Sequence, residues 1–155
     1  MVVVKGNRSE FLEVSVVGLG VGIEHVKAYL ETEKCKLSWV YDLDSSKAER
    51  FVEDIGQGRV AEHFDQIIED ENVDVVSIAS YDDDHFTQVL DALSAEKHVF
   101  VEKPLSDSSL KCQELIDLAD LKKRGLNRTI LELHQQGTVL LGICGGFQML
   151  GKTLQ

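Results

Sequence analysis

Short apolar runs alternate with longer stretches of mixed polarity along most of this chain. The apolar runs lie at 12–17, 37–41, 73–79 and 98–101, and each has the length of a buried strand. Strands that are separated by helices pair in parallel through right-handed crossovers. The pattern therefore predicts an α/β fold with a parallel sheet.

Helical periodicity fills the segments between these runs. Apolar side chains recur at i, i+3, i+4 and i+7 in three places, which puts each set on one face of a helix. The sets are Ala48, Phe51, Val52 and Ile55; Phe86, Val89, Leu90 and Leu93; and Cys112, Leu115, Ile116 and Ala119. Helices on both faces of the sheet give a three-layer, doubly wound domain, Rossmann-like or flavodoxin-like in its architecture.

Length and composition indicate a single domain over residues 1–155. The chain is 43% hydrophobic and 28% charged, as is usual for a folded protein. No apolar run approaches the ~18 residues that a membrane span needs. The opening residues lack the apolar region and cleavage site of a signal peptide, so we expect a cytoplasmic protein with no membrane partner. The three cysteines have no metal-ligand spacing, so we expect reduced thiols and no metal site.

The charge of the chain argues against nucleic acid as a partner. The formal net charge is −11, whereas binding to a polyphosphate depends on clusters of basic side chains. The charge is also uneven, because residues 118–155 contain five basic and only two acidic side chains. Such a step along the sequence indicates two origins or two roles for the two segments.

A glycine-rich turn follows the first predicted strand. Gly18, Gly20 and Gly22 form G-x-G-x-G, with the third glycine one residue earlier than in the G-x-G-x-x-G of dinucleotide-binding units. Asp42 lies 22 residues beyond Gly20, at the end of the second strand, where a carboxylate binds ribose hydroxyls. Because it would repel a 2′-phosphate, NAD is favoured over NADP. The alternative is a turn needed only for packing and a solvated Asp42.

Later segments strengthen the dinucleotide interpretation. VDVVSIA at 73–79, His85 and KHVFVEKP at 97–104, together with the glycine turn, resemble the nucleotide-binding domain of the Gfo/Idh/MocA oxidoreductase family over residues 12–117. The resemblance implies that the three glycines line the pyrophosphate and that Asp42 binds the ribose. It also implies that Glu102, Lys103 and Pro104 form the floor beside the nicotinamide.

Lys103 is a candidate catalytic residue at the edge of the sheet. An ammonium there can polarise a substrate hydroxyl or stabilise an alkoxide. The alternative is a surface ion pair with Glu102. We expect His85 to cap or pack rather than to transfer protons. In place of the proline that the family has before this histidine, the chain has Tyr81.

The C-terminal segment has a different resemblance. Its VLLGICGGFQMLG at 139–151 resembles the class I glutamine amidotransferase domain of cobyric acid synthases, over about residues 118–152. The resemblance implies that Cys144 is a nucleophile for the glutamine amide, since a thiol on a strand-to-helix turn has a lowered pKa. The family's histidine base belongs to a region beyond this turn. We therefore expect a structural role for Cys144.

These observations leave three interpretations. The main one is an engineered or recombined chimera without turnover, with NAD binding retained or lost, in which a helix at 126–136 and a strand at 138–143 complete the sheet. Its junction lies near residues 110–120. The second is an NAD-dependent oxidoreductase with a sugar or polyol substrate that lacks or borrows its C-terminal domain. The third is thiol chemistry at Cys144. An exposed apolar patch would favour a homodimer.

Overall fold

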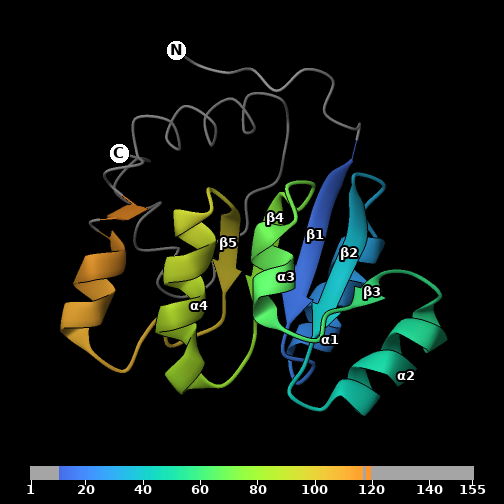
Figure 1. Cartoon of the computed structure of the whole chain (residues 1–155), viewed down its shortest axis with the longest axis horizontal. Coiled ribbons are helices and arrows are strands. Elements are labelled where there is room, and N and C mark those ends of the chain that lie inside the picture. The colour runs from blue at the N-terminus through green and yellow to red at the C-terminus, as the bar shows by residue number, and fades with distance from the viewer. Residues whose placement is uncertain (1–10, 117, 120–155) are drawn as a thin grey trace.

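The computed structural model describes residues 11–116, 118 and 119, and within them strands and helices alternate (Figure 1). Residues 109–116, 118 and 119 are also helical, as the periodicity predicts. The other elements in chain order are β1 (Leu12–Val17), α1 (Gly22–Leu30), β2 (Cys35–Tyr41), α2 (Ser45–Ile55), β3 (Arg59–Val60), α3 (Phe64–Glu69), β4 (Val75–Ile78), α4 (Asp82–Ser94) and β5 (His98–Val101).

The five strands form one parallel sheet in the order β3-β2-β1-β4-β5. In the centre of the sheet Val16 is aligned with Val40 of β2 and Ser77 of β4, and Ser77 is aligned with Phe100 of β5. After β3 the chain crosses over the sheet to β4, so that β4 and β5 extend the sheet on the other side of β1. This order confirms the doubly wound, Rossmann-like fold that the sequence predicts.

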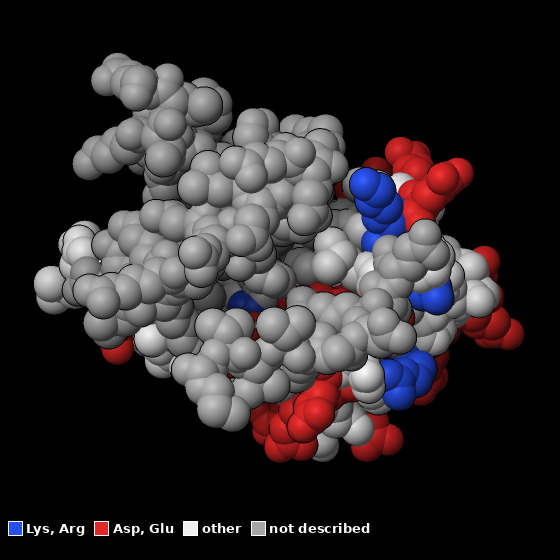
Figure 2. All heavy atoms as spheres, turned by 90° about the horizontal axis from the view of Figure 1, so that it is seen from above, with Lys and Arg blue, Asp and Glu red and all other residues white. Residues whose placement is uncertain are grey.

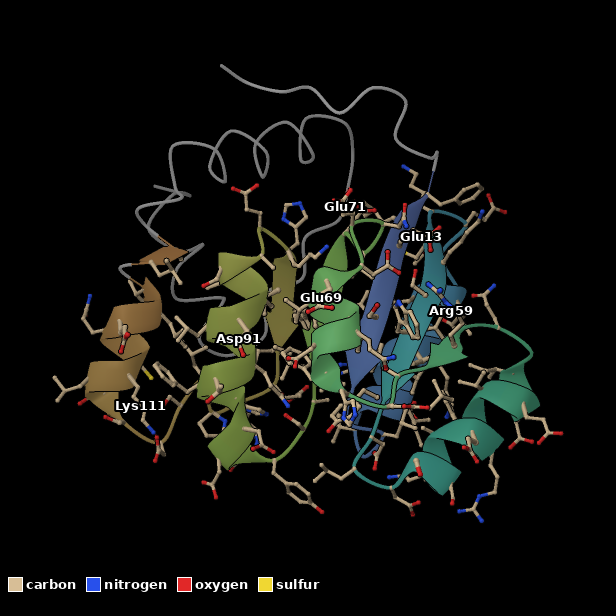
Figure 3. All side chains as sticks on the ribbon, in the orientation of Figure 1. Glu13, Arg59, Glu69, Glu71, Asp91 and Lys111 are labelled. Atoms are coloured by element: carbon tan, nitrogen blue, oxygen red, sulfur yellow. The ribbon has the colours of Figure 1, made fainter. Side chains whose placement is uncertain are left out.

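Two apolar clusters cover the two faces of the sheet. Helices α1 and α2 pack on one face, whose buried members are Val16, Leu19, Val26, Leu37, Val40 and Ala48. Helices α3 and α4 pack on the other, whose buried members are Val17, Ala61, Ile67, Val73, Val76, Ile78, Val89, Ala92 and Leu115. The solvent side of the second layer is acidic, with Glu69 on α3 and Asp91 on α4 (Figure 3). Three layers follow from this division.

The sequence pattern missed two elements and misplaced two boundaries. Strand β3 has only two residues and α3 only six, so neither is long enough to show a hydrophobic period. Strand β2 begins at Cys35 rather than residue 37, because the apolar run starts later than the hydrogen-bonded pairing with β1. Strand β4 begins at Val75, two residues inside the predicted run at 73–79.

Several predictions fall outside the described residues. Cys144, the helix at 126–136 and the strand at 138–143 all lie there. The single domain over 1–155 and the junction near 110–120 stay predictions. Within the described part of the chain, no helix combines the length and the hydropathy needed to cross a bilayer.

Candidate dinucleotide-binding site

The three glycines of the first turn meet different surroundings. Gly18 has φ +84°, and a Cβ on it would lie 2.4 Å from the Ala79 carbonyl oxygen, so only glycine fits. A Cβ on Gly22 would lie 3.0 Å from Val16 Cγ1, where α1 packs on the sheet. A Cβ on Gly20 would meet nothing within 4 Å among the residues that the structure describes. Two glycines thus serve the fold, while the third borders open space at the carboxyl edge of the sheet.

The first turn of α1 differs from that of α2. The N-cap of α1, Val21, offers no side-chain hydrogen bond to the free amides of the first turn. In α2 the N-cap Asp44 accepts a hydrogen bond from the Lys47 amide. The Glu24 amide donates to the Val21 carbonyl oxygen at 2.9 Å, but no N-cap side chain competes with an anion for the amides of Gly22 and Ile23, as in dinucleotide-binding units.

Asp42 follows β2 and lies against the glycine turn. Its Oδ2 accepts a hydrogen bond from the Leu19 amide at 2.7 Å, and its Oδ1 accepts one from the Asp44 amide at 2.9 Å. The Lys47 ammonium lies 3.5 Å from Oδ2. Burial favours the neutral acid, but the two amides and the Lys47 ammonium outweigh it and lower the pKa of Asp42. The carboxylate is therefore ionised and fixed beside the turn.

The Glu102–Lys103–Pro104 segment directly follows β5 at the same edge. The Glu102 amide donates to the Ile78 carbonyl at 2.9 Å, which extends the pairing of β5 with β4 by one bond. The Glu102 carboxylate binds His25, and no ion pair joins it to Lys103 in the part of the chain that the structure describes. The Lys103 side chain is exposed, and its peptide bond to Pro104 is cis.

His85 lies in the first turns of α4 and is buried, with 1% of its surface exposed. Its Nδ1 lies 2.7 Å from the Pro104 carbonyl oxygen, and its Nε2 lies 3.2 Å from the Ser80 carbonyl oxygen. The histidine packs, as the sequence predicts, but it also joins two connections of the same sheet edge. Residues 82–84 form the acidic first turn of the same helix.

Exposed apolar side chains border this edge. Val21 is 57% exposed on the glycine turn, Leu43 is 70% exposed after β2, and Tyr81 is 73% exposed before α4. They belong to three separate strand-to-helix connections, all at the carboxyl ends of strands. Apolar groups in such positions suit the flat rings of a dinucleotide, since ligand sites combine apolar walls with a few polar groups.

Three residues that no motif predicts lie beneath the site. His25 Nε2 lies 3.1 Å from Glu102 Oε1, and His25 Nδ1 lies 3.0 Å from Ser77 Oγ. Tyr29 also hydrogen-bonds to the Ser77 side chain. The sequence does contain a signal for Ser77, because a hydroxyl in an otherwise apolar buried strand must find a partner. Its partner could not be known without the fold.

Comparison with known proteins gives a family match over most of the chain. The model described as "Oxidoreductase family, NAD-binding Rossmann fold" (GFO_IDH_MocA) matches residues 12–127. The inositol 2-dehydrogenase/D-chiro-inositol 3-dehydrogenase of Lactiplantibacillus plantarum is 28% identical over 124 residues, which are 78% of this chain and 34% of the relative. The chain thus spans about a third of the length of this relative.

A solved structure and a second relative complete the comparison. The myo-inositol dehydrogenase of Lactobacillus casei, in complex with NAD(H) and myo-inositol, superposes with a TM-score of 0.66 and is 27% identical, over 70% of this chain and 33% of that one. The cobyric acid synthase of Desulforudis audaxviator is 54% identical over 43 residues, which are 28% of this chain and 9% of the synthase.

Proposed function

Since the chain belongs to the Gfo/Idh/MocA oxidoreductase family, with its NAD-binding Rossmann fold, we propose that it is the nucleotide-binding unit of an NAD-dependent oxidoreductase. This is the second of the three interpretations from the sequence, and the comparisons support it better than a chimera without turnover. The chimera stays a prediction, because the matches to cobyric acid synthases extend over only 38 to 43 residues.

The observation that carries the proposal is the open position of Gly20 beside a fixed carboxylate. Because a Cβ on Gly20 would meet no atom of residues 11–116 within 4 Å, a pyrophosphate can approach the backbone closely there. The Asp42 carboxylate accepts a hydrogen bond from the Leu19 amide of the same turn. It therefore lies beside the residue that directly precedes Gly20. This pairing fits a group that joins phosphate to ribose.

The cofactor that fits best is NAD rather than NADP. Asp42 is ionised, and a carboxylate accepts hydrogen bonds from the two ribose hydroxyls but repels a 2′-phosphate. The Lys47 ammonium neutralises part of this charge from 3.5 Å, and it is already engaged with the carboxylate. We therefore propose a preference for NAD that depends on Asp42.

The bound nicotinamide would supply hydride transfer, and this chain's residues supply the surroundings. Gly18, Gly20 and Gly22 form the turn under the pyrophosphate, and the exposed Lys103 ammonium hydrogen-bonds a substrate hydroxyl or alkoxide. A sugar or polyol is the substrate class we propose, since dehydrogenases of inositol are among the relatives. A cytoplasmic location and a homodimer stay predictions from the sequence.

Calorimetric titration of the full chain with NAD and with NADP tests the proposal. We expect NAD to bind and NADP to bind at least about tenfold more weakly. The substitution Asp42→Asn should weaken NAD binding by about 10- to 100-fold, the range for a hydrogen bond to a charged group. Glu49→Gln removes the same charge from an exposed position on α2 and should leave the affinity within about twofold.

Two results would contradict the proposal. Wild-type protein that gives no binding heat with millimolar NAD would exclude a dinucleotide site. Equal weakening by Asp42→Asn and Glu49→Gln would mean that only the net charge matters, and that the carboxylate beside the glycine turn has no contact with the ribose.

A further inference from the structure

The exposed Lys103 side chain makes no hydrogen bond or ion pair within residues 11–116, so its position depends on the residues on either side of it. We propose that His25 and His85 are positioning residues that hold the Glu102–Pro104 turn, and with it Lys103, at the nicotinamide end of the site. This inference rests on the proposed function, since it concerns how that site is held in shape.

His25 fixes the first residue of the turn. A carboxylate only accepts hydrogen bonds, so His25 Nε2 carries the proton and donates to Glu102 Oε1 at 3.1 Å. Nδ1 then accepts from the Ser77 hydroxyl at 3.0 Å. The edge-on contact of the imidazole with Phe100, with ring centroids 5.1 Å apart, fixes the plane of the ring. Both nitrogens and the ring orientation are thus determined.

Tyr29 extends this set of contacts along α1. Its hydroxyl hydrogen-bonds to Ser77, and burial raises the pKa of Tyr29 although the Ser77 hydrogen bond opposes the shift. Tyr29 and His25 lie one helical turn apart on α1, and both contact the same serine of β4. Because Ser77 is completely buried, its contacts with His25 and Tyr29 fix the position of α1 on the sheet.

His85 fixes the last residue of the turn. The shorter of its two contacts, 2.7 Å, joins Nδ1 to the Pro104 carbonyl oxygen, so Nδ1 donates its proton there. In this tautomer Nε2 has no proton to donate, so its 3.2 Å approach to the Ser80 carbonyl oxygen, in the connection between β4 and α4, is a packing contact. With 1% of its surface exposed, His85 has no alternative partner in water.

The two histidines approach the turn from opposite faces of the sheet. His25 belongs to α1, which packs on the face with Val16, whereas His85 belongs to α4, which packs on the face with Val76. His25 also lies three residues after Gly22, where α1 begins. Its bond to Glu102 therefore sets the distance between the glycine turn and Lys103, that is, between the proposed pyrophosphate and nicotinamide positions.

Comparing two ligands separates this positioning role from general stability. ADP-ribose has the pyrophosphate and both riboses but no nicotinamide, so its affinity reports the glycine turn and Asp42. The ratio of the Kd of ADP-ribose to that of NADH, measured by calorimetry on the full chain, reports the nicotinamide end. The variants are His25→Leu and His85→Leu, with His25→Gln and His85→Asn as conservative counterparts, since each amide can donate from near the original nitrogen.

We expect both leucine variants to bind ADP-ribose with an affinity within about twofold of wild type. The ratio of the Kd of ADP-ribose to that of NADH should fall about tenfold, which is the effect of losing one hydrogen bond. The amide variants should recover most of the ratio. His98→Leu is the control, because it removes a histidine from β5, the strand that leads into the Glu102–Pro104 turn, at the end of the strand that is far from this turn. It should leave the ratio unchanged. If a leucine variant does not fold, Glu102→Ala removes the His25 acceptor at a partly exposed position and should lower the ratio similarly.

The outcomes distinguish this inference from the proposed function. Wild type that binds neither ligand would overturn the proposed function and this inference with it. Wild type that binds both, with a ratio unchanged in His25→Leu and His85→Leu, would overturn the positioning role alone. Equal losses of ADP-ribose and NADH affinity would also overturn it, because they would show general destabilisation.

Discussion

The two edges of the sheet differ in what they leave exposed. At the amino edge, charged side chains bind one another and the backbone. At the carboxyl edge Asp42 and Glu102 are also paired, but Lys103 is exposed without a partner among residues 11–116, and a Cβ on Gly20 would meet no described atom within 4 Å. Three of the exposed large apolar side chains also lie at the carboxyl edge. The same fold thus separates the region that contributes stability from the region that is left free for a ligand.

Asp70 is the centre of the amino edge. Its Oδ2 accepts from Trp39 Nε1 and from Arg59, both at 2.9 Å, and its Oδ1 accepts from the Asn72 amide at 2.9 Å. The Arg59 guanidinium also lies over the Trp39 ring at 3.8 Å, and Lys97 donates to the Asp70 carbonyl oxygen at 2.6 Å. Figure 2 looks down on this edge and shows acidic and basic side chains near one another on its described part.

The largest effect should come from the glycine turn, which contributes both to the stability of the fold and to the proposed ligand site. Gly18→Ala places a Cβ 2.4 Å from the Ala79 carbonyl oxygen at a positive φ, so it should lower the free energy of unfolding by more than about 3 kcal/mol. Gly20→Ala should leave stability nearly unchanged and weaken NAD binding at least about tenfold. Denaturant unfolding and calorimetry check the pair. Similar unfolding losses in both variants would remove the distinction between the two glycines.

Asp70→Ala should affect stability and not binding. It leaves the partly buried Trp39 indole N–H without its acceptor and the Arg59 guanidinium without its ion pair, at a cost of about 2–3 kcal/mol. The affinity for NAD should stay within about twofold, because the cluster lies at the opposite edge from the proposed site. Urea unfolding and NAD titration of the same sample measure both. A tenfold loss of affinity would show that the edges are coupled.

Acid should lower the stability of the fold through protonation of Asp70. Burial opposes ionisation, but hydrogen bonds from Trp39, Asn72 and Arg59 outweigh it and lower the pKa of Asp70 from 3.8 to about 2. A lowered carboxyl pKa stabilises the fold fully above about pH 4, and this stabilisation is lost as the pH falls toward 2. We expect a loss of about 1–2 kcal/mol after allowing for solvent screening. Unfolding measured from pH 5 to pH 2 should show a weaker dependence in Asp70→Asn than in wild type.

The smallest effect lies between the edges, in the middle of β1. The buried Ser15 hydroxyl has no hydrogen-bond partner among residues that the structure describes, so Ser15→Ala should change stability by no more than about 1 kcal/mol, in the stabilising direction. Ser77→Ala is the matched comparison, because it removes the hydroxyl that binds His25, and it should destabilise by about 1 kcal/mol. Thermal unfolding measures both. Equal losses would mean that Ser15 has a partner after all.

The sequence predicts the fold better than it predicts the site. Long helices such as α2 and α4 bury one face over several turns, so their apolar period is visible without a structure. The two-residue β3 has no such period, and it exists because Trp39 and Val40 of β2 offer it a pairing edge. Short elements of this kind depend on their neighbours rather than on their own residues.

The site shows the same division. Asp42 could be placed from its spacing to Gly20, since both lie at the ends of adjacent strands, and the structure does put its carboxylate on the Leu19 amide. The contact of His25 with Glu102 spans 77 residues, and no spacing rule connects them. It arises because the first turn of α1 brings His25 over Ser77 of β4 and against Phe100 of β5, which only the three-dimensional arrangement reveals.

Hydrogen exchange of the full chain with and without saturating NAD tests the contrast between the edges most directly. We expect slower exchange in peptides covering 18–24, 42–47 and 102–105, and unchanged exchange in those covering 70–74 and 96–98 at the opposite edge. Protection at 70–74, or no protection of the glycine turn at saturation, would contradict this contrast.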